Sequence, residues 1–173
     1  MCIRDRVINF KSHYLVVMGI HQLRVTDAQQ SEAARHASAQ IAADYLKRAY
    51  ELDPTNGRAE FFHGFALTKK NTYDDVVAGT KHLEEGQILY PQSDTFYALG
   101  MGYEARRKLA LQAVEYLKTN LPSLREQVEE IPDAIDRQEY EEKLAEYEAK
   151  IVEYEQDAIL SHQKAIESYM TCL

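Results

Sequence analysis

The sequence predicts an all-α chain in which stacked antiparallel helix pairs are followed by an acidic helical hairpin. Apolar residues recur at steps of three and four along almost the whole chain, and no stretch alternates with a period of two. A helix-ending proline also returns after 37 residues, at Pro54 and Pro91. With 173 residues, 45% of them apolar, the chain is long enough for one domain, or at most two, with a buried core.

The first predicted pair consists of helices at 8–25 and 27–52. Thr26 and Gln29 have the spacing of a capping box, which predicts that the second helix begins there. Residues 53–57, Asp-Pro-Thr-Asn-Gly, then end this helix, because Pro, Asn and Gly favour turns. The pair therefore spans residues 7–54.

The second and third predicted pairs span residues 57–91 and 93–121. In the second pair, a helix at 58–69 is followed by one that Thr72 caps and that ends before Pro91. In the third pair, the first helix begins at Ser93 or Asp94. It turns near Arg106-Arg107 and is followed by a second helix that ends at Pro122.

The charge and the apolar spacing of residues 122–173 predict an acidic helical hairpin. They carry 14 acidic and 5 basic side chains, a net charge of −9, whereas the whole chain carries −8. Apolar residues step by four and three on both sides of Pro132, which fits either a coiled-coil seam or two helices that pack on each other. Because only two or three heptads lie on each side, we favour the antiparallel hairpin. A truncated further repeat is the alternative for the end of the chain.

Repeated motifs support the stacked arrangement. The pattern Ala42-x3-Leu46-x2-Ala49-x4-Pro54 returns as Gly79-x3-Leu83-x2-Gly86-x4-Pro91, and the next helix contains Phe96-x2-Leu99-Gly100-x2-Tyr103. These motifs resemble tetratricopeptide repeats, helix pairs of about 34 residues whose first helix reads W-x2-L-G-x2-Y. The resemblance covers residues 13–121 and implies a right-handed α-solenoid. An unrelated array of α-hairpins remains the alternative.

The first six residues predict that the chain is a fragment. They read Met-Cys-Ile-Arg-Asp-Arg, which resembles the in-frame translation of a transposon-end sequencing adapter. We therefore expect residues 1–6 to be an artefact and the natural protein to extend upstream.

The resemblance also implies a binding groove, because the first helices of tetratricopeptide-like pairs line a concave surface. The matching positions are Arg58, Phe61, Phe65 and Thr68 in the second pair and Asp94, Tyr97, Met101 and Glu104 in the third, with His13, Val16, Ile20 and Leu23 in the first. This lining is aromatic and apolar with charged edges, which suits an amphipathic helix or an extended apolar peptide. The alternative is that these side chains pack against a neighbouring repeat or the hairpin.

No motif in the sequence predicts catalysis or a cofactor. Cys-x2-Cys, His-Glu-x2-His and glycine-rich phosphate loops are all missing. Glu60-x2-His63 has the spacing of half a carboxylate-bridged di-iron site, but no other histidine has a glutamate three residues before it. We therefore expect a partly buried helix histidine and no metal. Tyrosine also recurs every seven residues, at Tyr140, Tyr147 and Tyr154. These tyrosines form either a packing stripe or a partner-binding stripe.

These features favour a non-catalytic protein–protein interaction scaffold, with the cytoplasm as the favoured location. The acidic last third argues against nucleic acid as a partner, because phosphates attract basic surfaces. The longest uncharged apolar run, residues 15–20, is far shorter than the roughly 20 residues of a membrane span. The alternatives are the helical arm of a larger enzyme, such as a transferase, and a subunit of a membrane-associated assembly.

Overall fold

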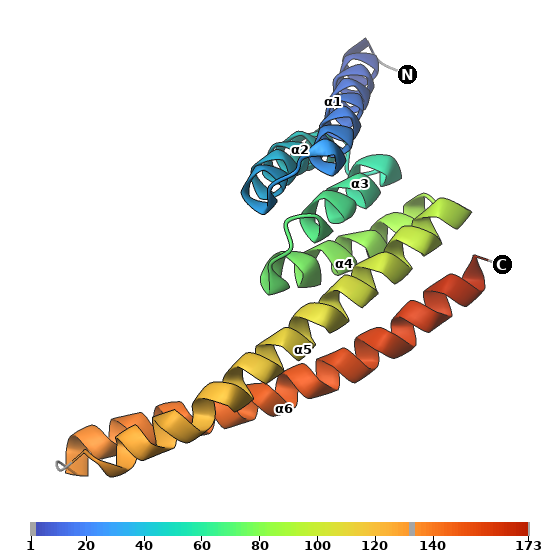
Figure 1. Cartoon of the computed structure of the whole chain (residues 1–173). Coiled ribbons are helices and arrows are strands. Elements are labelled where there is room, and N and C mark those ends of the chain that lie inside the picture. Colours follow the sequence, from blue (N-terminus) through green and yellow to red (C-terminus); the bar gives the residue numbers. More distant parts are fainter. Residues whose placement is uncertain (1–2, 132–133, 173) are drawn as a thin grey trace.

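The computed structural model describes residues 3–131 and 134–172, and these lie in six α-helices and the turns that join them (Figure 1). The helices are α1 (Ile3–Ala28), α2 (Glu32–Leu52), α3 (Gly57–Thr68), α4 (Tyr73–Leu89), α5 (Ser93–Glu129) and α6 (Ala134–Thr171). The described part of the chain contains no strand, which confirms the all-α prediction. Residues 1–2 of the expected adapter segment and Pro132 lie outside the described residues.

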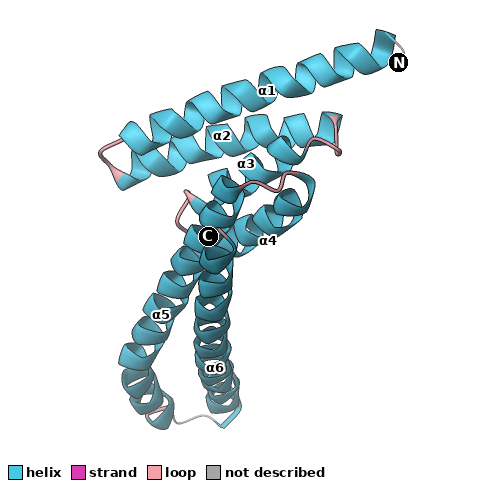
Figure 2. Cartoon of the chain, turned by 90° about the vertical axis from the view of Figure 1, so that its right-hand side faces the viewer, coloured by secondary structure: helices cyan, strands magenta, loops and turns pink. Residues whose placement is uncertain are grey.

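Consecutive helices pack against each other from α1 to α6, and α3 also contacts α1 and α5. In Figure 1 the helices α1 to α4 follow one another as a stack, from which α5 and α6 extend together as a long arm. Figure 2 shows the same arm projecting away from the plane of α1 and α2. Among the described helices, none combines the length and the apolar character that a membrane crossing requires.

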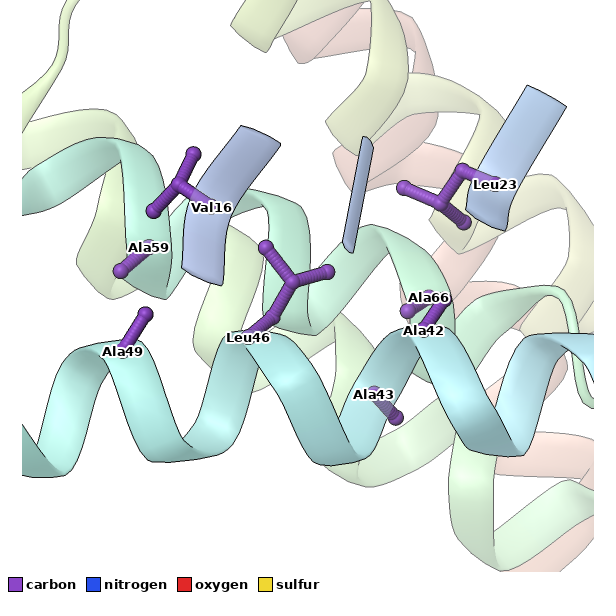
Figure 3. Packing of buried hydrophobic residues seen from close by; sticks show 8 residues of the cluster. All are labelled: Val16, Leu23, Ala42, Ala43, Leu46, Ala49, Ala59 and Ala66. Atoms are coloured by element: carbon purple, nitrogen blue, oxygen red, sulfur yellow. The ribbon is translucent and has the colours of Figure 1, made fainter. Parts of the chain in front are cut away.

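The core is divided into two clusters that share the short helix α3. The first lies between α1, α2 and α3, where Leu46 of α2 points toward α1 between Val16 and Leu23 (Figure 3). Gly19 of α1 faces Leu46 so closely that a Cβ atom at this position would overlap its side chain. The second cluster lies between α3, α4, α5 and α6 and consists of Phe61, Leu83, Ala98, Leu99, Tyr103 and Ala165.

The second helix of each pair buries the same kind of three-residue pattern. In α2 it is Ala42, Leu46 and Ala49, in α4 it is Gly79, Leu83 and Gly86, and in α6 it is Ser161, Ala165 and Ser168. All nine residues are buried, with identical steps of four and three. The helix that pairs with the start of α5 is therefore the end of α6.

The predicted turn near Arg106-Arg107 is wrong, because α5 continues as one helix from Ser93 to Glu129. A third pair within 93–121 consequently does not form, and the hairpin begins at Ser93 instead of at residue 122. Two arginines do not interrupt a helix, since arginine is a good helix former. Arg106 forms an ion pair with Asp157 of α6.

Pro122 lies inside α5 although an internal proline costs a helix about 3 kcal/mol. Packing against α6 offsets this cost on both sides of Pro122. Val114 and Val128 are buried, and the ion pairs Lys118–Glu155 and Arg125–Glu148 join the two helices.

The predicted start of the second helix is also wrong, since the N-cap of α2 is Ser31. The Ser31 hydroxyl accepts a hydrogen bond from the Ala34 amide at 3.2 Å. Thr26 instead lies inside α1 and is buried, with its hydroxyl 3.0 Å from Oγ of Ser38 on α2. The predicted N-cap at Thr72 is confirmed.

Candidate functional site

The groove positions predicted on α3 face mainly the protein interior. Phe61 is only 4% exposed and packs in the second core cluster, so the expectation of an exposed aromatic at this position is wrong. Phe65 is half-buried between both clusters, and the ammonium of Lys69 lies 5.0 Å from the centre of its ring. The physical reason is that α3 has 12 residues and contacts four other helices.

The two polar positions of α3 are also engaged locally. The Arg58 guanidinium lies 5.9 Å from the centre of the Phe62 ring, and its Nε atom is buried without a hydrogen-bond partner among the described residues. The Thr68 hydroxyl donates to the carbonyl of Phe65 at 2.8 Å. Both side chains therefore interact with residues of α3 itself.

Two of the four positions predicted on α5 contact the last third of α6. The Tyr97 ring is centred 5.8 Å from that of Tyr169, and Glu104 lies 3.5 Å from His162. Met101 packs against the second core cluster, whereas Asp94 is exposed. Tyr97 remains 55% exposed and is the main accessible aromatic of the eight positions.

The matching positions on α1 are divided in the same way. Val16 and Leu23 are buried in the first core cluster, Ile20 is half-buried against it, and His13 is exposed. Across α1, α3 and α5, the structure places the predicted positions on helices that contact each other in turn. Most of their apolar members, however, fill the core instead of lining an open groove.

One apolar surface that remains open is a stripe on the outer face of α1, which we call the α1 stripe. Other exposed apolar side chains, such as Ile88, Ile159 and Met170, lie on α4 and α6. The α1 stripe consists of Val7, Phe10, Tyr14 and Val17, with exposed fractions of 47%, 73%, 55% and 50%. Beside it, Phe10, Tyr14, Leu15 and Leu52 line a shallow groove between α1 and α2, edged by the cations Lys11 and Arg48.

Sequence reasoning missed the α1 stripe because it treated residues 8–25 as one largely buried element. The helix in fact has two apolar faces. Val16 and Leu23 belong to the inner face, and Phe10, Tyr14 and Val17 belong to the outer face at steps of four and three. The signal that could have revealed the second face is the helical spacing itself, because it divides the apolar residues of this helix into two sets.

Glu60 and His63 meet His82 and Glu85 of α4, which sequence reasoning did not connect with them. Glu60 Oε1 lies 2.7 Å from His82 Nδ1, and the His63 and His82 rings are centred 4.5 Å apart. Burial raises the pKa of Glu60 and lowers that of His63 to about 4, so His63 is neutral at neutral pH. The missed signal is His82-x2-Glu85, which is Glu-x2-His in reverse order and faces Glu60-x2-His63 when the helices run antiparallel.

No protein-family model, no curated protein and no solved structure is significantly similar to this chain.

Proposed function

We propose that this chain is a non-catalytic scaffold of tetratricopeptide-like helix pairs that binds an amphipathic helix of another protein on the α1 stripe. The observation that carries the proposal is the exposure of Val7, Phe10, Tyr14 and Val17 along one helix face. Their steps of three, four and three keep them on one side of α1. Contiguous apolar surface of this kind marks interaction sites on protein surfaces.

The chemistry of the surroundings favours a partner helix with acidic edges. Lys11 and Arg48 are exposed beside Phe10 and Tyr14, at the rim of the groove between α1 and α2. An amphipathic helix can place apolar residues at i, i+3 or i+4 and i+7 into such a surface. Acidic side chains next to that stripe would then face the two cations, which favours the correct orientation and faster association.

The repeated packing of helix pairs also supports the α1 stripe as a binding surface. Each second helix buries its small–x3–X–x2–small motif against the first helix of its pair, at Leu46 in α2, Leu83 in α4 and Ala165 in α6. In arrays of this kind each pair contacts only its neighbours, through faces on which further helices pack. The α1 stripe is the face on which a further helix packs in such an array.

The proposal is tested by selecting helical peptides from a displayed library on the purified protein. The Phe10→Ser/Tyr14→Ser double variant removes two anchors of the stripe. Tyr116→Ser removes an aromatic that is 69% exposed on α5 and serves as the matched control.

We expect selected peptides to carry an apolar stripe with acidic edges. They should bind wild type and Tyr116→Ser equally and bind the double variant about 30-fold or more weakly, as loss of two aromatic anchors implies. Peptides that bind the double variant as well as wild type, or a selection that enriches none, would refute the proposal.

A further inference from the structure

The helices α3 and α4 approach each other unusually closely, and this approach brings four metal-binding side chains together. A Cβ atom at Gly64 would lie 2.7 Å from the carbonyl oxygen of Gly79, so the two backbones are in direct contact at this crossing. Next to it, Glu60-x2-His63 on α3 lies opposite His82-x2-Glu85 on α4. Each helix thus contributes one glutamate and one histidine.

Three of these side chains lie close to the spacing of ligands of one ion. The ligand atoms of Glu60, His82 and Glu85 all lie within 4.8 Å of one another. Two ligands of one tetrahedral Zn²⁺, with bonds of about 2.0–2.1 Å, lie about 3.4 Å apart. Side-chain rotations that shorten these separations by up to about 1.4 Å would bring all three into bonding distance.

Two buried polar atoms in this cluster have no partner that explains their burial. Glu60 is 1% exposed, and its Oε2 forms no hydrogen bond within the described part of the chain. His63 is 8% exposed, and the same holds for its Nδ1. Burying a carboxylate oxygen without a compensating interaction is costly, so such atoms favour the binding of a cation beside them.

We propose that Glu60, His82 and Glu85 bind a divalent transition-metal ion, with Zn²⁺ as the best fit, and that His63 lies beside this ion. Imidazole together with carboxylate suits Zn²⁺, whereas Mg²⁺ and Ca²⁺ prefer oxygen ligands alone. The ion would compensate the buried charge of Glu60 and take the place of the proton shared with His82. Because its ligands come from two helices, it would hold α3 against α4.

The ion has a route to this cluster. His63 and His82 line an open groove between α2 and α4 together with Gln40, Tyr50 and Leu67. Glu85 is exposed and His82 is partly exposed, so the cluster is accessible to solvent from this side although Glu60 is buried. An ion can therefore bind the folded protein without separation of the helices.

The test is a metal titration of the full chain after removal of any histidine tag and treatment with a chelator. Co²⁺ is added as a spectroscopic substitute, because its visible absorption reports coordination directly, and Zn²⁺ is then used to displace it. Thermal unfolding with Zn²⁺ and with Mg²⁺ provides a second readout.

Three variants make the test specific. Glu85→Gln and His82→Gln each remove one ligand from a position that is at least partly exposed, so the fold should tolerate them. His162→Gln is the matched control, because His162 is an exposed histidine 3.5 Å from Glu104.

We expect one Co²⁺ per chain, displacement by Zn²⁺, and a higher unfolding temperature with Zn²⁺ and not with Mg²⁺. Changes next to metal ligands weaken binding about 10–100-fold, so loss of a ligand should weaken it by at least that range, while His162→Gln leaves it unchanged. Absence of visible Co²⁺ absorption in the wild type, or equal affinity in Glu85→Gln and His82→Gln, overturns the proposal. So does a loss of affinity in His162→Gln as large as that in the ligand variants.

Discussion

Replacing Gly64 by alanine tests whether contact between α3 and α4 requires a glycine. The added Cβ atom would lie 2.7 Å from two backbone atoms of α4, the Gly79 oxygen and the Leu83 nitrogen. Ordinary contact for a Cβ atom begins at 3.4 Å, so the new methyl is about 0.7 Å too close. Because both obstacles are backbone atoms within a helix, α4 as a whole has to move away from α3.

The expected magnitude is the difference between two opposing effects. Overpacking costs about 1–3 kcal/mol, and contact with backbone on the opposing helix places Gly64→Ala near the upper end. Alanine in a helix is about 1 kcal/mol more favourable than glycine, which opposes this cost. We expect a net loss of about 2 kcal/mol, equivalent to a decrease of about 4–8 °C in Tm for a chain of this size.

The assay is urea and thermal unfolding followed by circular dichroism, with Gly100→Ala as the matched control. Gly100 is also a buried helix glycine at a crossing, but its added Cβ would meet the Tyr169 side chain, which is near the end of α6 and can rotate. We expect Gly100→Ala to remain within about 1 kcal/mol of wild type. If Gly64→Ala is as stable as Gly100→Ala, backbone contact between α3 and α4 does not limit this position.

Two further predictions concern the ion pairs that hold α6 against α5 and α4. Asp157→Asn leaves Arg106 partly buried without its counter-charge, since the Asp157 carboxylate is 9% exposed and accepts from Arg106 Nε at 2.9 Å. We expect a loss of about 2 kcal/mol in urea unfolding. For Glu84, burial raises the carboxyl pKa, but hydrogen bonds from Lys164 and Tyr103 outweigh it and hold the pKa below its usual 4.5. A depressed pKa in the folded state stabilises above the unfolded value, so wild type should exceed Glu84→Gln in stability at neutral pH and lose this advantage as the pH falls below 4.5.

Each of these predictions has its own control. Glu148→Gln removes the exposed ion pair with Arg125 on the arm and should cost about 0.5 kcal/mol or less. A similar cost for Asp157→Asn would contradict a specific role for the Arg106 pair. For Glu84, an advantage of wild type that persists undiminished at about pH 3 would contradict the assigned cause.

The sequence by itself determined the helical class and those helix ends that depend on neighbouring residues. Thr72 caps α4 as predicted, and the turn at 53–57 separates α2 from α3. Both depend on hydrogen bonds or backbone preferences within about four residues, which a local pattern contains.

The extent of the third pair was decided by tertiary structure. Arg106-Arg107 and Pro122 read as helix ends in the sequence, yet α5 continues through both because α6 packs along it. The buried motif that completes the pair, Ser161-x3-Ala165-x2-Ser168, lies some 60 residues beyond Gly100. A repeat period derived from the shorter pairs could not anticipate an arm of this length.

The candidate sites were determined by helix rotation, which the sequence alone does not specify. Whether Phe10 or Phe61 is exposed depends on which face of its helix the neighbours cover. The pairing of Glu60 with His82 depends on the antiparallel crossing of α3 and α4, between residues 22 positions apart. Local sequence patterns determine which residues share a helix face, but only the packing of the helices determines whether that face meets solvent, core or another set of ligands.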